Sequence, residues 1–126
     1  MVTTTGAFSG FCVDDIDAAR VFHAETLGLS VTTNEMRFLE LQLDSGARTL
    51  IYAKPRHTPA SFTILNFPVD DVEAAVDDLN ARGVTAKIYP DDVMPSDSKG
   101  IMRGNGPDVA WFLDPAGNVL SVLSSR

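Results

Sequence analysis

The chain has 126 residues, the usual length of one domain, and we predict a single domain over residues 1–126. Hydrophobic residues make up 44% and charged residues 21% of the sequence, a balance that excludes a disordered chain. No apolar run is long enough to cross a membrane, so we expect no membrane partner. The formal charge of −7 disfavours nucleic acid as a partner, because its phosphates would be repelled, and favours neutral or cationic ligands.

The predicted elements form the same series twice, each time a strand, a helix and three more strands. In the first half these are strand 6–13, helix 15–27 and strands 29–33, 36–43 and 48–53. In the second half they are strand 61–68, helix 70–82 and strands 84–88, 107–113 and 118–123. The stretch 54–60, which holds two prolines, is the predicted linker between unit 1 (6–54) and unit 2 (61–124).

An internal repeat supports this division. Residues 11–19 recur as residues 67–75 at an offset of 56, and each copy has an acidic pair that can cap the following helix. Each helix is predicted to end at a glycine, Gly28 or Gly83. The turn at 43–46 is echoed by the turn at 113–117, at an offset near 70, and both predict hairpins.

The change of offset places about fourteen extra residues in the segment 90–107, which is polar and rich in proline and glycine. Long loops inside compact domains are usually functional lids or disordered inserts, and we favour a lid.

Cys12 is the only cysteine, so it has no partner for an internal disulfide. Residues 1–6 carry neither the basic nor the apolar segment of an export signal. Both features lead us to expect a cytoplasmic location.

The order of these motifs resembles the vicinal oxygen chelate superfamily, which includes glyoxalase I, extradiol dioxygenases and the fosfomycin and bleomycin resistance proteins. The residues that carry the resemblance are Val13-Asp14-Asp15, Phe22, Leu27-Gly28, Val69-Asp70-Asp71 and Asp114-Pro115-Ala116-Gly117-Asn118. The resemblance covers nearly the whole chain. It implies an α+β fold of two tandem βαβββ units, whose curled mixed sheets form a cup.

Enzymatic members of this superfamily hold a divalent metal with His or carboxylate side chains from the first and last strand of each unit. Those positions correspond here to Phe8 and Ile51 in unit 1 and to Ile64 and Ser121 in unit 2. Three of these four side chains have no donor atom for a metal. We therefore predict no metal site and no other cofactor.

We expect neither histidine to have a catalytic or metal-binding role. We expect His23 to be a core residue at the end of the first helix and His57 to be a solvated linker residue.

With the vacated metal positions facing the cup, strand alternation assigns further residues to that face. The predicted ligand-binding residues, of which Met102 and Arg103 come from the loop, are Phe8, Cys12, Phe38, Glu40, Ile51, Ile64, Asn66, Met102, Arg103, Phe112 and Ser121. This largely apolar and aromatic lining is typical of a small-molecule pocket, although a cup filled as ordinary core would have the same composition.

Three of these residues carry a charge or a nucleophile. Glu40 is a weak candidate for a general base or for the counter-charge to a cation, and a solvated carboxylate at the rim is the alternative. Arg103 could anchor an anionic ligand. No His or Lys lies near Cys12 in the sequence, so we interpret Cys12 as a small apolar residue.

We predict a metal-independent small-molecule-binding protein of the glyoxalase/bleomycin resistance type, with an apolar or aromatic ligand that the acidic charge favours as a cation, and hence a role in antibiotic resistance. Two alternatives stay open. One is a metal-free enzyme for a carbonyl or aromatic metabolite (lyase-, isomerase- or dioxygenase-like), and the other is a non-catalytic regulatory or interaction module. The resemblance also implies a homodimer.

Overall fold

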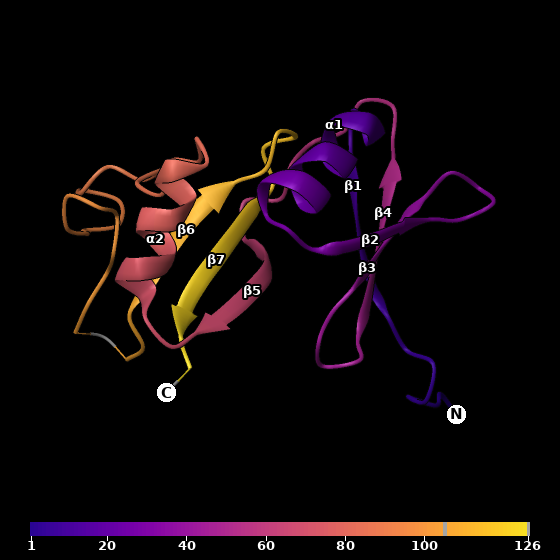
Figure 1. Ribbon diagram of the computed structural model, residues 1–126, viewed down its shortest axis with the longest axis horizontal. Coiled ribbons are helices and arrows are strands. Elements are labelled where there is room, and N and C mark those ends of the chain that lie inside the picture. The colour runs from indigo at the N-terminus through magenta and orange to yellow at the C-terminus, as the bar shows by residue number, and fades with distance from the viewer. Residues whose placement is uncertain (105, 126) are drawn as a thin grey trace. The chain divides into compact units, whose positions relative to one another are not determined.

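The computed structural model describes residues 1–104 and 106–125. The chain divides into two compact units, Met1–Pro59 and Ala60–Arg126, so the boundary falls at the end of the predicted linker. Each unit contains one sheet and one helical segment, and the predicted α+β class is confirmed (Figure 1). Among the described residues, no helix is long and apolar enough to cross a membrane.

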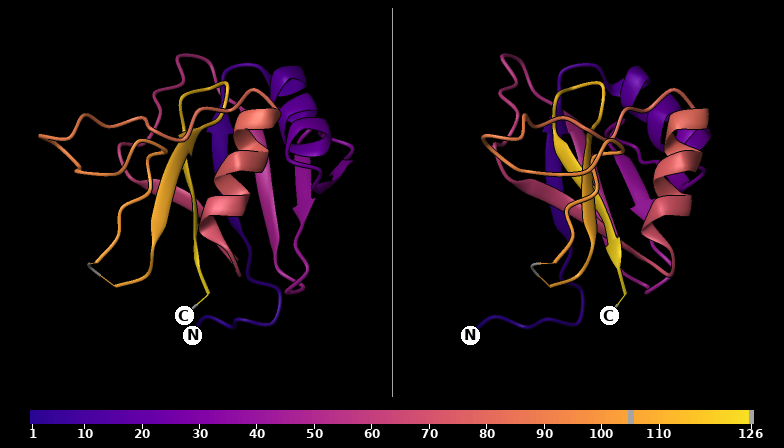
Figure 2. Two further views of the ribbon diagram at one scale, coloured as in Figure 1. Left: turned by 60° about the vertical axis from the view of Figure 1, so that its left-hand side comes forward. Right: turned by 90° about the vertical axis from the view of Figure 1, so that its left-hand side faces the viewer.

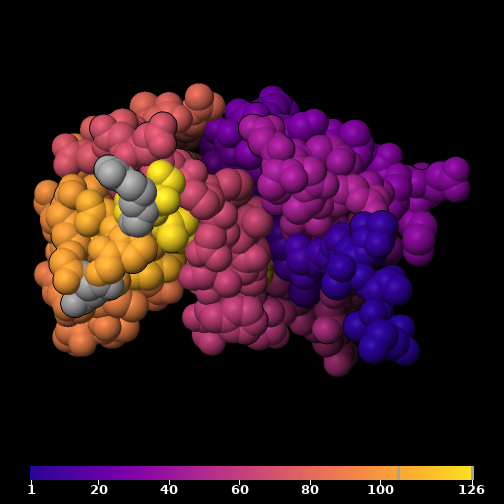
Figure 3. Space-filling model, turned by 90° about the horizontal axis from the view of Figure 1, so that it is seen from below, coloured from indigo at the N-terminus to yellow at the C-terminus, as the bar shows by residue number. Residues whose placement is uncertain are grey.

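Unit 1 has the predicted βαβββ series (Figure 1). Its elements are β1 (Ser9–Val13), α1 (Ile16–Val21), the π-helical turn η1 (Phe22–Thr26), β2 (Ser30–Thr33), β3 (Leu39–Gln42) and β4 (Arg48–Ala53). The strand order is β1-β4-β3-β2, and only β1 and β4 run parallel. The residues before β1 are exposed and lie on the surface (indigo in Figure 3).

Both helices begin and end as the repeat predicts. The carboxylate of Asp15 accepts hydrogen bonds from two backbone amides of the first turn at 3.1 Å, and Asp71 accepts one at 3.1 Å. These bonds satisfy amides that no helix carbonyl can reach. After each helix Gly28 (φ 72°) and Gly83 (φ 85°) adopt the left-handed conformation, which glycine reaches without a steric penalty and which ends the helix.

One face of the unit 1 sheet is covered by its helical segment. Phe11, Ile51 and Leu39 are neighbours across β1, β4 and β3, and all three are buried. The ring of Phe11 lies 5.9 Å from the ring of His23 on η1. The core of unit 1 is therefore on this side.

The opposite side of the same sheet is named the open face here. Gly10, Leu50 and Glu40 are neighbours across the same three strands, one residue along from the buried set. Because successive side chains of a strand point to opposite sides, these residues lie on the open face.

Unit 2 differs from the prediction by one strand. Its elements are β5 (Thr63–Val69), α2 (Val72–Ala81), β6 (Val109–Leu113) and β7 (Val119–Ser124), with strand order β5-β7-β6. The predicted strand 84–88 is wrong, since residues 84–88 form no strand. The loop before β6 pairs with the start of this strand instead. Met102 and Val109 exchange two backbone hydrogen bonds of 2.8 and 3.1 Å.

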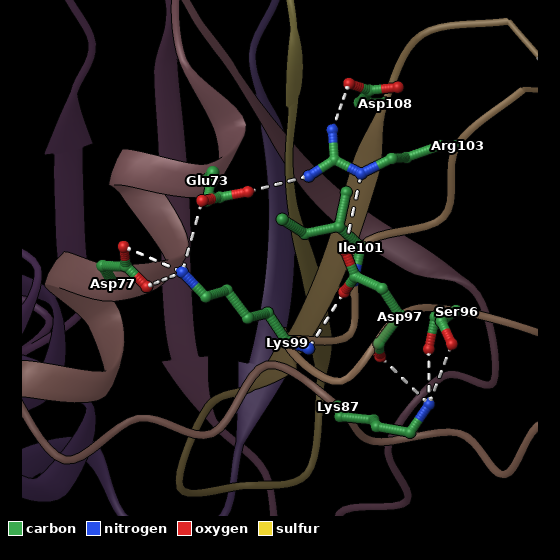
Figure 4. A network of polar contacts seen from close by, with 9 residues as sticks. All are labelled: Glu73, Asp77, Lys87, Ser96, Asp97, Lys99, Ile101, Arg103 and Asp108. Carbon is green, nitrogen blue, oxygen red and sulfur yellow. Dashed lines mark hydrogen bonds and ion pairs between the residues drawn. The ribbon is translucent and has the colours of Figure 1, made fainter.

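The long connection from α2 to β6 (orange in Figure 2) is tied to its own unit by cationic side chains. Lys99 and Arg103 both bind Glu73 of α2, at 3.4 and 3.1 Å (Figure 4). Farther along the network Lys87 donates to the hydroxyl of Ser96 at 2.7 Å. The two contacts with Glu73 fasten the connection to α2, and the Lys87–Ser96 bond ties two parts of the connection together. A lid function for residues 90–107 stays a prediction.

The two hairpin turns align at an offset of 71 rather than 70. The amide of Gly46 donates to the carbonyl of Leu43, as the amide of Gly117 donates to the carbonyl of Asp114, and both 117 − 46 and 114 − 43 equal 71. Each residue of β7 therefore corresponds to a residue of β4 one position earlier than the sequence echo indicates.

Candidate functional site

A hollow of about 240 Å³ opens on the unit 1 sheet. Its apolar lining comes from the exposed side chains Phe8 and Met36 and the half-buried Phe38 and Leu50, and its polar lining from Asn34, Glu40 and Arg48. The structure thus brings together three of the predicted ligand-binding residues: Phe8, Phe38 and Glu40.

A tight turn between β2 and β3 positions one wall of the hollow. The side-chain oxygen of Asn34 accepts hydrogen bonds from the backbone amides of Met36 and Phe38, at 2.9 and 3.0 Å. Asn favours such turns because its short side chain can bond to the backbone just ahead of it. The turn fixes the backbone of Met36 and Phe38 beside the start of β3.

The polar groups of the hollow form one connected set. Arg48 Nη1 lies 3.5 Å from Glu40 Oε1, and its guanidinium carbon lies 5.4 Å from the centre of the Phe8 ring. Asn34 Nδ2 lies 3.5 Å from the other oxygen of Glu40. The Glu40 side chain is 24% exposed and that of Arg48 48% exposed, so both lie partly in water, where an ion pair of this kind contributes little to stability.

The prediction that Ile51 faces the cup is wrong. Ile51 is fully buried and pairs with Phe11 on the helix-covered face. The cause is the hairpin offset: with 71 in place of 70, Ser121 corresponds to Leu50, which lines the hollow. A slip of one residue moves a whole strand to the other face.

In unit 2 the pairing of β7 with β5 and β6 determines which side chains lie on the same face. Ser121 pairs with Asn66 on β5 and with Trp111 on β6, and its hydroxyl lies 2.6 Å from Asn66 Oδ1. Phe112 instead pairs with Leu120, and both are buried. The prediction that Phe112 shares a face with Ser121 is therefore wrong, and Trp111 takes that place.

The remaining predicted residues of unit 2 lie in three settings. Ile64 is half-buried on β5, at the irregular register between Thr63 and Leu65. Met102 is half-buried and pairs with Val109 through its backbone. The guanidinium of Arg103 contacts the carboxylates of Glu73, Asp97 and Asp108 at 3.1, 3.4 and 3.0 Å, so an anionic ligand would have to displace these carboxylates.

The residues at the superfamily's metal positions do not fit a metal. With the corrected register the four positions hold Phe8, Leu50, Ile64 and Ser121, and only Ser121 has a side-chain oxygen. Within residues 1–104 and 106–125, no three His, Cys, Asp or Glu side chains come together in a way that could hold a metal ion. Divalent metals of this kind need several such donors.

The interpretation of His57 as a solvated linker residue is wrong. His57 is half-buried, and its Nδ1 lies 3.0 Å from the sulfur of Cys12. The two residues are 45 positions apart in the sequence, so the contact depends on the parallel pairing of β1 and β4, which sequence spacing alone does not reveal.

His23 is a core residue, as expected. It is fully buried between Phe11 and Phe22, with ring centres 5.9 and 5.2 Å away. In the described part of the chain, neither of its ring nitrogens has a hydrogen-bond partner. Desolvation by burial lowers the pKa of His23 to about 4, so the ring is neutral near pH 7.

Comparison with solved structures shows the same fold in several proteins. They include TnmS3, an antibiotic binding protein from Streptomyces sp. CB03234 (22% identity over 99% of this chain and 100% of that chain, TM-score 0.72), and the fosfomycin resistance protein FosX from Listeria monocytogenes (11%, 100% and 96%, TM-score 0.72). A superfamily member from Sphaerobacter thermophilus DSM 20745 is similar as well (19%, 98% and 100%, TM-score 0.71). At these identities the likeness shows the fold alone.

No curated protein matches the chain. A family model does match residues 6–122, and it is described as the Glyoxalase/Bleomycin resistance protein/Dioxygenase superfamily. The match spans nearly all of both units, in agreement with the fold and with the repeat. The chain therefore belongs to the glyoxalase/bleomycin resistance protein/dioxygenase superfamily.

Proposed function

We propose that the protein binds a small aromatic molecule, without a metal, in the hollow on the open face of unit 1. The observation that carries the proposal is the lining: two exposed apolar side chains, Phe8 and Met36, stand beside the half-buried Phe38 and Leu50. Large apolar side chains left in water around a concavity are typical of ligand sites. A ligand that covered them would gain free energy from the apolar surface removed from water.

The ring geometry favours a flat ligand. Phe38 already pairs with Tyr52, their ring centres 6.0 Å apart, and Phe8 carries the Arg48 guanidinium over its face. Aromatic side chains prefer offset or edge-to-face partners at such distances. An aromatic ligand would extend these contacts along the sheet.

The Glu40 carboxylate gives the hollow a group that could bind a cationic part of a ligand. Glu40 is held by Arg48 at 3.5 Å and by Asn34 at 3.5 Å, both longer than a strong charge-assisted hydrogen bond. A ligand cation could therefore replace Arg48 at the Glu40 carboxylate. The net charge of −7 would attract such a ligand from a distance.

Two similar folds support this class of function. TnmS3 is an antibiotic binding protein and FosX is a fosfomycin resistance protein. We propose a related role in antibiotic resistance for this chain. The alternative in which Glu40 is a general base has less support, because among the described residues no His, Cys, Lys, Asp or second Glu lines the hollow with it as a partner for proton transfer.

From the resemblance, we also propose that the protein is a cytoplasmic homodimer. Light scattering on the purified chain would give its mass in solution.

The test is a panel of aromatic cations and their neutral isosteres, first screened by thermal shift and then titrated by calorimetry. A ligand present at about 100 times its Kd should stabilise the fold by about 2.7 kcal/mol. Phe38→Ala should weaken binding about tenfold or more, because buried aromatic contacts dominate binding energies. Val21→Ala, an exposed apolar position on α1, is the matched control and should leave Kd unchanged.

The charge of the ligand is tested with two further variants. Glu40→Gln should weaken binding of the cation and leave binding of its neutral isostere unchanged. Arg48→Met should strengthen binding of the cation, because it removes the guanidinium that competes for Glu40. If no compound of the panel stabilises the protein, or if Phe38→Ala and Val21→Ala bind equally well, the hollow is not the binding site.

A further inference from the structure

The only cysteine of the chain lies against a histidine on the open face of unit 1. Cys12 Sγ is 3.0 Å from His57 Nδ1, and both side chains are half-buried. Cys12 follows Gly10 by two residues in β1, so its side chain points to the same side as those of Leu50 and Glu40. A thiol and an imidazole nitrogen are thus in contact on the open face.

Backbone geometry holds the histidine over the strand. The amide of Lys54 donates to the carbonyl of Val13 at 2.9 Å, which extends the pairing of β1 and β4 by one residue. The chain then turns at Arg56, whose φ of 59° lies in the left-handed region. A non-glycine residue in that region is uncommon and marks a sharp local turn. This turn brings His57 back toward Cys12.

We propose that Cys12 is a covalent capture site for α,β-unsaturated carbonyl compounds, with His57 as the proton acceptor. The sulfur attacks the β-carbon of the compound, so that an S–C bond forms while the π bond of the C=C breaks. The thiol proton passes to His57 Nδ1, and the electron pair moves to the carbonyl oxygen as an enolate. Return of that proton to the α-carbon gives a neutral thioether and a neutral imidazole, with no oxidant or reductant required.

The chemistry depends on contact between the two groups. A thiolate is the reactive form of cysteine, and a neighbouring base that accepts the proton during attack is the usual way to activate a thiol. Nδ1 can accept when the ring proton is on Nε2.

The site also lies within reach of molecules that visit the hollow. Tyr52 is the register partner of Cys12, and its ring is 6.0 Å from the ring of Phe38, which lines the hollow. The capture reaction itself does not require binding in the hollow, so it can be tested separately from the proposed function.

The experiment measures the second-order rate constant for N-ethylmaleimide, an α,β-unsaturated carbonyl compound, at neutral pH by intact-protein mass spectrometry. With one cysteine in the chain, every adduct on sulfur is at Cys12, and Cys12→Ser gives the background. We expect the folded protein to react faster than the same chain in guanidinium. His57→Phe should lower the rate constant about tenfold or more, as loss of a general base does.

Thr58→Ala is the matched control, an exposed residue beside His57, and should keep the rate of the unchanged protein. His57→Gln is a second variant in case phenylalanine disturbs the fold, which thermal melting would reveal. The proposal is overturned if the folded chain reacts no faster than the unfolded chain, as expected for a merely shielded thiol. It is equally overturned if both folded His57 variants react at the unchanged rate.

Discussion

Replacing His23 by phenylalanine should remove a specific loss of stability in mild acid. Burial lowers the pKa of His23 from 6.5 to about 4. As the pH falls below 6.5, the unfolded chain therefore takes up a proton that the folded chain refuses until about pH 4, and stability falls through this window. One pKa unit corresponds to about 1.4 kcal/mol. Relative to neutral pH, the unfolding free energy therefore falls by about 2 kcal/mol at about pH 5 and by about 3 kcal/mol below pH 4.

The assay is urea unfolding at several pH values between neutral and pH 4, for the unchanged protein, His23→Phe and His23→Leu. Both variants should show a flatter dependence of unfolding free energy on pH, whatever their stability at neutral pH, because neither side chain can bind the proton. His57→Ala removes the other histidine and should retain the steep dependence. Parallel curves for the unchanged protein and both His23 variants would show that protonation of His23 does not cause the loss of stability.

Two further predictions concern unit 2. Asp114→Ala should lower the unfolding free energy by about 2 kcal/mol in urea unfolding, because the buried carboxylate accepts from the amide of Asn118 at 2.7 Å and from its side chain at 3.0 Å. The exposed Asp44→Ala is the control and should change it by less than about 0.5 kcal/mol, so equal losses would contradict the account. Partial desolvation raises the pKa of Asp97, but two backbone amides and Arg103 outweigh it, and the net pKa lies below the ordinary 3.8. The stabilising contribution of Asp97 is therefore present above pH 3.8 and lost as the pH falls through the lower folded value. The protection factors of the loop amides against hydrogen exchange should fall there, and Asp97→Asn should show no such additional fall.

The fold could be predicted because its signals are local and occur twice. Asp15 and Asp71 each precede a helix, and Gly28 and Gly83 each follow one, so capping chemistry fixed the element order at both ends. The strand at 84–88 could not be excluded in the same way. Whether an apolar stretch joins a sheet depends on which segment pairs with its edge, and here Met102 does so.

The repeat in the sequence predicts the two hairpins but not their exact register. The echo of the two turns in the sequence suggests an offset of 70, while the hydrogen bonds of Gly46 and Gly117 show 71. This single residue exchanged Ile51 for Leu50 on the open face. The side chains of the two strands alternate so strictly that such an error inverts the assignment of the whole strand.

The candidate site was only partly visible in the sequence. Phe8 follows from the metal position that the superfamily resemblance implies, Phe38 and Glu40 follow from strand alternation, and all three line the hollow. Asn34 was missed because it enters through a side-chain turn rather than a strand. Met36 was missed although the predicted strand 36–43 places it on the same side as Phe38 and Glu40. The signal that could have revealed the turn is Asn34 itself, since an Asn a few residues before a strand often bonds to the backbone of a turn.

A crystal structure with the tightest compound of the panel would show whether the open face of unit 1 encloses an aromatic ligand. We expect ring density against Phe38 and Met36, with any cationic group within hydrogen-bonding distance of Glu40. Density located away from the hollow, with Phe8, Phe38 and Leu50 still facing solvent, would contradict it.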